Sequence, residues 1–307
     1  MTRVPDYASQ QSLLLDFMRT QRQSFETQQQ ISSGKVSDDY KGIGPDVSVL
    51  VSAKAAETQA DNYVQVGGQV TQKLEIQNLQ LEAIAQQAVD LRQAASEAVA
   101  NNSGVALMEQ LEGFTRAAIN ALNTEVNGVR IFAGSRTDTP PVNISTLDDL
   151  EAAGAVADVF DNDDLRPATR LGDNEVIEYG FLAEEIGTEL FESLKRIADY
   201  NAGPNGPFSA ELTGAQATFL QGELNALSDL TDNVNVAVAR NGVHFNSVEQ
   251  AVDIATKQRD LMTLVVADIE DVDLAEAATR LNQDQVAMEA TARVLADATN
   301  LSLLNFI

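Results

Sequence analysis

Hydrophobic positions recur in alternating steps of four and three residues between Ala56 and Ala98. Only Gly67 and Gln77 interrupt this apolar series. A seam sustained over about six heptads is typical of a coiled-coil helix, which would be roughly 65 Å long here. The seam consists of Ala56, Ala60, Tyr63, Gly67, Val70, Leu74, Gln77, Leu81, Ile84, Ala88, Leu91, Ala95 and Ala98.

Shorter helical patterns lie on both sides of this seam. A first helix is predicted over Ser9–Ser33, with Gly34 as its stop, and a glycine-containing loop follows at Lys35–Pro45. Another helix is predicted over Leu107–Leu122. Because only a short turn at residues 101–104 separates it from the long seam, the two helices should form an antiparallel pair.

Helical periodicity returns in the last third of the chain. Apolar positions from Phe219 to Ile269, among them Ile254, predict a second long helix. The segment Asp271–Asp273 indicates a break or an N-cap. The last helix, Leu274 to about Asn300, contains neither Gly nor Pro. Its predicted seam is Leu274, Ala278, Leu281, Met288, Ala292 and Leu295.

The pattern changes at Asn127-Gly128, where apolar and polar residues alternate over Val129–Ala133 and predict a strand. The following segment is acidic and rich in turn residues, with a hairpin strand expected at Val176-Ile177 and a helix at Glu189–Tyr200. The fold class predicted is therefore mainly α. Long antiparallel coiled-coil helices come from both chain ends, with a small inserted α+β or β outer domain. The expected domains are a terminal helical assembly domain (1–45 with 274–307), a helical-bundle core (46–134 with 213–273) and an inserted surface domain (135–212).

Charge is distributed unevenly along the chain. The formal net charge is −26, which disfavours nucleic acids and anionic lipid surfaces as partners. Residues 148–199 hold about 15 acidic and 4 basic side chains, whereas residues 1–45 hold about 5 of each. The middle of the chain is thus expected to face solvent, and the ends to be covered. No apolar run approaches the ~20 residues of a membrane span, and we expect export without a cleaved signal peptide.

The last residues, Leu301–Ile307, are apolar and almost uncharged. Exposed on a monomer, they would be an association site. Together with the amphipathic first helix, they suggest ends that pair with each other and with other subunits. The alternative is an ordinary bundle in which both ends pack back on the chain's own core. The expected assembly interface is Leu14, Met18, Phe25, Ile31, Leu274, Leu281, Met288, Leu295, Leu301, Leu303 and Leu304.

Residues able to support catalysis or ligand binding are scarce. The chain has no Cys and a single His, His244, which sits beside Phe245 and is interpreted as a packing residue. The run Asp161–Asp164 resembles the start of a calcium loop. However, Arg166 stands where such a loop needs Gly, and Gly172 stands where it needs Glu. We interpret the run as a solvated turn, and we expect no catalytic residue, metal or cofactor.

Three stretches resemble motifs of the bacterial flagellin family. Gln28–Lys35 is similar to the N-terminal signature that ends in two hydroxyl residues, Gly and a basic residue. Ile269–Ala277 resembles the entry to the family's last helix, and Leu301–Leu304 resembles its C-terminal close. The resemblance covers about the first 135 and the last 100 residues, and the combination is specific where each piece alone is weak.

Two roles exist within this family, the filament-forming flagellin and the hook-associated protein of the hook–filament junction. Asn127–Pro141 is similar to the junction protein's exit into its outer domain, and Ala239–Asn246 to its return segment. Ser37–Gly42 lacks the Asn-Ser that usually precedes the Asp pair, which leaves both roles open.

The resemblance implies a non-enzymatic, self-assembling flagellar subunit outside the cell, with adjacent hook, junction and filament subunits and an export chaperone as partners. It also implies that the subunit passes unfolded through the flagellar export channel, which the absence of Cys suits. The rival hypotheses are a cytoplasmic coiled-coil scaffold or chaperone, and a secreted enzyme with an acidic active site in the middle domain.

Overall fold

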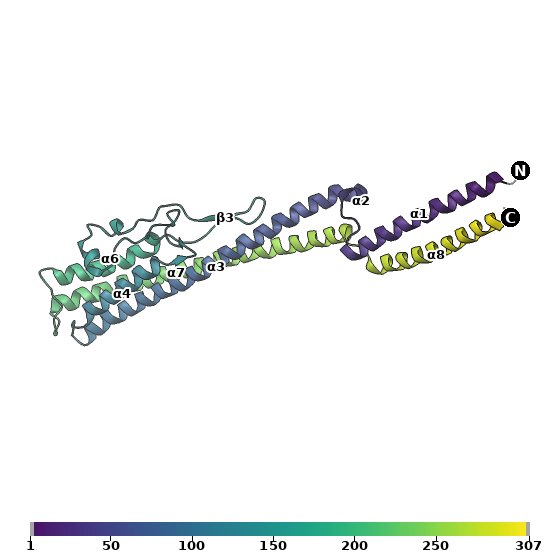
Figure 1. Cartoon of the computed structure of the whole chain (residues 1–307). Helices are drawn as coiled ribbons and strands as arrows, with labels where there is room; N and C mark the ends of the chain where they lie inside the picture. The colour runs from purple at the N-terminus through teal and green to yellow at the C-terminus, as the bar shows by residue number, and fades with distance from the viewer. Residues whose placement is uncertain (1–2, 305–307) are drawn as a thin grey trace. The chain divides into compact units, whose positions relative to one another are not determined.

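The computed structural model describes residues 3–304, and side chains for residue 8 and residues 11–297. The chain divides into two compact units: Met1–Gln59 with Lys257–Ile307, and Ala60–Thr256. In the first unit, α1 (Arg3–Ser33) packs against α8 (Leu274–Leu304). Figure 1 shows these two helices side by side and running in opposite directions.

The first and last helices are each longer than predicted. Helix α1 begins at Arg3 rather than Ser9, and Pro5 is tolerated because it lies in the first turn, where its missing N–H is not needed. Helix α8 continues four residues past Asn300. The predicted loop Lys35–Pro45 contains the single-turn α2 (Tyr40–Ile43), capped by Asp39, and runs into the short 3₁₀ helix η1 (Gly44–Asp46).

The long helix α3 (Val47–Ala100) confirms the predicted seam within the second unit. From Ala60 to Ala98 every seam position is buried except Tyr63, which is half-buried. Gly67 lies against α7 (Gly214–Glu270), where a Cβ would come 2.2 Å from Val252 Cγ2. The other interruption, Gln77, is 2% exposed and donates a hydrogen bond to the Ile131 carbonyl at 2.8 Å.

The core of the second unit lies between α3, α4 (Leu107–Leu122), α6 (Ala183–Ala202) and α7. Helix α4 turns back alongside α3, as the short connection predicted (Figure 1). The apolar positions predicted for α7 between Phe219 and Val238 face this core, and Phe245, Val248 and Val252 pack in a second cluster. Ile254 does not: it is exposed, and Ala255 takes the buried position instead.

Strands are few and short. Strand β1 (Glu125–Val126) pairs antiparallel with β2 (Val129–Arg130), and β3 (Ala168–Arg170) pairs with β4 (Val176–Glu178), which confirms the predicted hairpin. The predicted strand Val129–Ala133 stops at Arg130. Its last three residues do not alternate, because Ile131, Phe132 and Ala133 are all buried in the core.

Between the strands lie two short helical turns, α5 (Leu147–Ala152) and η2 (Val156–Val159). Helix α6 begins six residues before the predicted Glu189, at Ala183. Its first turn is supported from outside the helix, because the Glu184 N–H donates to Asn162 Oδ1 at 3.1 Å. The fold is thus mainly α with a small inserted mixed segment, as predicted.

The close approach at Gly67 predicts opposite effects for two neighbouring substitutions. In Gly68→Ala the new Cβ meets nothing within 4 Å, so better helix propensity should stabilise the protein by up to about 1 kcal/mol. In Gly67→Ala the methyl group collides with Val252, and overpacking should cost about 1–3 kcal/mol relative to Gly68→Ala. Thermal and urea unfolding followed by circular dichroism measure both. Equal stability of the two variants would contradict close packing at Gly67.

Candidate assembly surface

The contact between α1 and α8 is narrow and partly polar. On α1, the less exposed positions recur in steps of mostly four and three, and on α8 a matching stripe begins at Ala277. Ser24 and Thr27 are the most buried side chains of α1. The α1 stripe is Leu13, Phe17, Thr20, Ser24, Thr27 and Gln30, and the α8 stripe is Ala277, Leu281, Asp284, Met288, Thr291 and Leu295. Because small polar residues occupy much of this seam, the pair buries little apolar surface on its own.

The predicted interface residues fall into two groups. Leu281, Met288 and Leu295 are half-buried on the α8 stripe, and Ile31 is half-buried near the end of α1. The others with described side chains point away from the helix pair. They are Leu14, Met18, Phe25 and Leu274, with 44%, 55%, 67% and 55% of their surface exposed. Leu301, Leu303 and Leu304 belong to α8, but their side chains lie outside the described part, as does Asn305–Ile307 entirely.

The structure adds apolar residues that the sequence prediction missed. Leu15 on α1 and Val286 and Val294 on α8 are also exposed, at 61%, 68% and 50%. The prediction assumed one apolar face per helix, whereas each helix carries an inner stripe and a second apolar set outside it. Apolar residues outside the single series of four-and-three steps were the signal that could have revealed them. Outer sets of this kind are available to partners.

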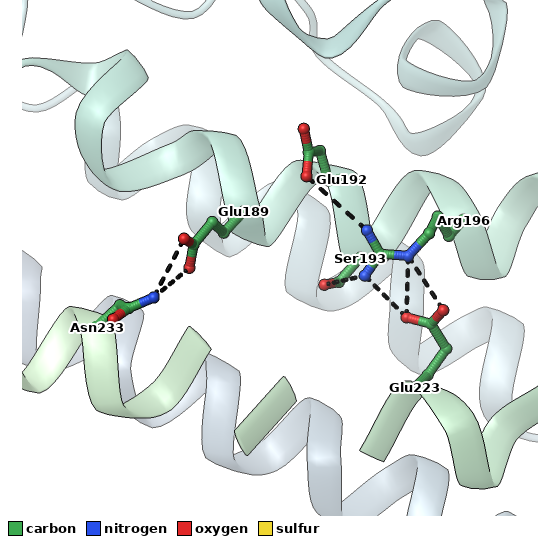
Figure 2. Close-up of polar contacts among 6 residues, drawn as sticks. All are labelled: Glu189, Glu192, Ser193, Arg196, Glu223 and Asn233. Carbon is green, nitrogen blue, oxygen red and sulfur yellow. Dashed lines mark hydrogen bonds and ion pairs between the residues drawn. The ribbon is translucent and has the colours of Figure 1, made fainter. Parts of the chain in front are cut away.

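The inserted segment is held against α7 by polar contacts between α6 and α7. Figure 2 shows Arg196 on α6 binding both carboxylate oxygens of Glu223, with its Nε at 3.0 and 3.2 Å from them and its Nη2 at 2.9 Å from Oε2. Glu223 is 8% exposed, and its carboxylate raises the pKa of the guanidinium. Further along, the Asn233 amide donates to both carboxylate oxygens of Glu189 (Figure 2). Bidentate pairs of this kind fix the relative orientation of the two side chains as well as their distance.

A second cluster joins the same segment to α7 around Glu185. This carboxylate accepts from Arg166 and from Arg240, each at 3.0 Å. The Arg240 guanidinium also lies 5.3 Å from the centre of the Phe181 ring. His244, one turn further on α7, meets the same ring edge-on with 6.2 Å between centroids. His244 is therefore half-buried in an aromatic contact, which agrees with its interpretation as a packing residue.

The Asp163 carboxylate accepts several hydrogen bonds at the point where the chain leaves the helical core. One of its carboxylate oxygens accepts from the Ser135 N–H at 2.8 Å and from the Leu165 N–H at 3.2 Å. The Ser135 hydroxyl donates to the other oxygen. These hydrogen bonds, first of all that from the Ser135 hydroxyl, hold the pKa of Asp163 below its ordinary value. The acidic run that resembles the start of a calcium loop thus includes a carboxylate that closes a turn.

Comparison with known proteins bears on these elements directly. Residues 224–307, which include most of α7 and all of α8, match the family model described as the bacterial flagellin C-terminal helical region. The C-terminal part of this chain is therefore similar to the helical region of flagellins. The family resemblance drawn from the sequence is thereby confirmed. No curated protein sequence gives a significant match.

Two solved structures share the fold. One was assigned as a flagellar hook-associated protein from Vibrio parahaemolyticus. It matches with a TM-score of 0.59 and 14% identity, over 76% of this chain and 99% of that one. The other, FlgL from Bacillus cereus, matches with a TM-score of 0.52 and 13% identity, over 70% of this chain and 96% of that one. At such low identity, these likenesses establish the fold alone.

The exit and return motifs have structural roles in this fold. Asn127 and Gly128 have φ of +53° and +80° and form the left-handed turn between β1 and β2. In the return motif, Arg240 binds Glu185, and Asn241 donates to the Leu74 carbonyl at 2.9 Å. The exit motif thus forms a turn where the chain leaves the helical core, and the return motif contacts both the inserted segment, at Glu185, and α3, at Leu74. Among the described residues, no group of three or more acidic, His or Cys side chains could hold a metal ion. Nor is any described helix long and apolar enough to cross a bilayer.

The surroundings of His244 predict that the stability of the folded protein depends on pH. Burial, and then the nearby charges of Arg240 and Arg166, lower its pKa below 6.5, while Glu185 opposes them. The folded state thus favours neutral His244, and stability should decrease as pH falls below about 6.5 through the lowered pKa. Because the chain has one His, a single NMR titration measures this pKa. Arg240→Met should raise it and Glu185→Gln should lower it further; an unperturbed wild-type value would contradict the cluster.

Proposed function

We propose that this protein is a non-enzymatic structural subunit of the bacterial flagellum, positioned at the junction between hook and filament. The observation that carries the proposal is a fold shared with two flagellar hook-associated proteins over most of their length. The exit and return motifs described above favour the junction role over that of filament flagellin. The alternative remains a flagellin that builds the filament itself.

Assembly would proceed through the terminal helices. The outward apolar side chains described on α1 and α8 are 44–68% exposed, and burying each large one against a neighbour contributes about 1.5–3 kcal/mol. The full proposed interface is the set predicted from the sequence, together with Leu15, Val286 and Val294. The acidic residues between 148 and 199 would oppose lateral association of free subunits, because like charges repel.

The role proposed for each region follows the predicted domains. Residues 1–45 with 274–307 form the assembly domain, residues 46–134 with 213–273 form the supporting bundle, and residues 135–212 face water. The partners are further copies of this chain, adjacent hook, junction and filament subunits, and an export chaperone before secretion. The protein acts outside the cell after export, and binds neither nucleic acid nor membrane.

Seeded self-assembly tests the proposal. Purified monomer is mixed with isolated hooks and, separately, with ammonium sulfate, which strengthens apolar burial, and both samples are imaged by negative-stain microscopy. A monomer that binds hook ends without elongating supports the junction role. Long filaments would assign the chain to filament flagellin instead. A monomer that binds nothing, and whose terminal amides are already protected from exchange, would favour a cytoplasmic scaffold.

A matched pair of surface variants tests the interface. Phe25 and Leu165 are equally exposed, at 67%, but lie on α1 and on the inserted segment respectively. Phe25→Ser should weaken hook-end binding about 10- to 100-fold, the equivalent of about 1.5–3 kcal/mol of apolar burial, without lowering the melting temperature of the monomer. Leu165→Ser should leave binding unchanged. Equal binding by both variants would contradict the proposal that α1 belongs to the interface.

A further inference from the structure

A small pocket lies within the second unit, beside the segment through which the chain leaves the helical core. Its volume is about 140 Å³, and it is lined by residues of α3 and of the segments 129–137 and 165–179. Of the described residues that line it, three are basic (Lys73, Arg130 and Arg166) and none is acidic. The whole chain has 46 acidic and 20 basic residues, so a lining whose charges are all positive is unusual in this protein. We name it the cationic pocket.

The two arginines of the cationic pocket already have acidic partners. Arg130 Nη2 lies 3.2 Å from Glu125 Oε2, and Arg166 Nη2 lies 3.0 Å from Glu185 Oε2. The Glu185 carboxylate also binds Arg240, again at 3.0 Å. Because one carboxylate is shared between two guanidinium groups, the charge of Arg166 is only partly neutralised.

The lysine and a tyrosine hydroxyl are left without partners. Lys73 is half-buried on α3, and no described residue forms a hydrogen bond or an ion pair with its ammonium group. Tyr179 is 7% exposed, and its hydroxyl likewise has no hydrogen-bond partner among the described residues. Burial raises the pKa of this phenol, so the hydroxyl remains a donor at neutral pH. Two donors, one of them charged, favour an anionic oxygen as their ligand.

Gln77 contributes an unpartnered acceptor to the same pocket. Its side chain is 2% exposed, and its Nε2 donates to the Ile131 carbonyl at 2.8 Å, while its Oε1 has no hydrogen-bond partner. Glycine at position 180 leaves room for this amide, since a Cβ there would lie 3.0 Å from Nε2. A buried carbonyl oxygen without a donor costs stability. The position therefore favours an occupant that brings an N–H group or a water molecule.

The size and the chemistry of the pocket select one kind of occupant. Pockets that hold a drug-sized molecule measure about 300–1,000 Å³, so this one suits a single side chain with its peptide group. A sulfate or chloride ion would offer acceptors alone, whereas an acidic residue within a protein offers both a carboxylate and an N–H. Val129, Leu165 and Pro167 in the lining exclude water and strengthen such an ion pair. With 46 acidic residues, another copy of this chain is a ready source of the carboxylate.

We propose that the cationic pocket receives an acidic side chain from a second copy of this chain, whose carboxylate accepts hydrogen bonds from Lys73 and Tyr179. The proposal rests on the proposed function and adds to it a contact between neighbouring subunits that does not involve the terminal helices. Repulsion between acidic subunits keeps free copies apart, and a local charge pair of this type then selects one relative position of the two.

Zero-length crosslinking identifies the occupant directly. A carbodiimide joins a carboxylate to the Nζ of a lysine in contact with it as an amide, and takes up the water that is lost. Equal amounts of unlabelled and isotope-labelled wild-type protein are assembled on hooks, treated, digested and analysed by mass spectrometry. Lys73 should give mixed-label crosslinks to Asp or Glu. Lys195, whose Nζ lies 3.4 Å from Asp199 of its own chain, should give same-label crosslinks only.

Two results on assembled protein would overturn the proposal: a Lys73 that stays unmodified, and a Lys73 joined only to its own chain or to a hook subunit. If wild-type protein does not bind hooks, the proposed function fails, and free protein concentrated in sodium sulfate decides the matter, because sulfate promotes association. Mixed-label crosslinks at Lys73 in that sample would support the pocket, and their absence would overturn it.

A pair of charge-neutralising substitutions on α3 provides a second test. Lys73→Met and Arg92→Met each remove one positive charge, and Arg92 is exposed and outside the pocket. Lys73→Met should weaken assembly at hook ends about tenfold or more, because it removes one partner of a desolvated charge pair, whereas Arg92→Met should not. Neither variant should melt below wild type, since neither side chain has an ion pair among the described residues. Equal assembly by the two variants would rule out the pocket as a subunit contact.

Discussion

The close packing of α3 against its neighbours is the interaction on which the rest of the structure depends. Small and aliphatic side chains fill its buried positions, and Gly67 lets Val252 approach where any side chain would collide. This seam positions α4 and α7, and α7 in turn holds the inserted segment through Arg196–Glu223 and the cluster around Glu185. The apolar seam therefore supplies stability, while buried polar pairs specify how the segment is oriented.

The terminal helices follow a different principle. The most buried α1 residues of their mutual seam are the small polar Ser24 and Thr27, and several large apolar side chains are left outside it. A pair built in this way gains little from its own packing, so its stability must come from other contacts. Within the chain, the antiparallel hydrogen bonds between residues 34–36 and 270–272 provide some of them. In the proposed assembly, neighbouring subunits provide the rest. This arrangement would make the ordering of the ends depend on partners.

Much of the fold could be predicted because long helices leave a strong periodic signal. The α3 seam was predicted residue by residue from Ala60 to Ala98, and Gly34 and Asp271–Asp273 correctly marked helix ends. Short-range alternation was less reliable: Val129–Ala133 was predicted as a strand, but tertiary burial of Ile131–Ala133 overrides that pattern. The exposed apolar residues Val286 and Val294 were missed because periodicity alone does not show which of two apolar stripes a neighbouring helix covers. Ion pairs such as that of Lys54 Nζ with Glu270 Oε1, 2.5 Å apart, join distant segments, and no local pattern encodes them.

The central claim is that the apolar side chains left uncovered on the terminal helices become buried against neighbouring subunits. Hydroxyl-radical footprinting of the wild-type protein, free and bound to hooks, tests it without any substitution. Met18 and Phe25 should be oxidised readily in the monomer and protected on hook binding, whereas Leu165 should react equally in both states. Unchanged reactivity of Met18 and Phe25 in the bound protein would contradict the account.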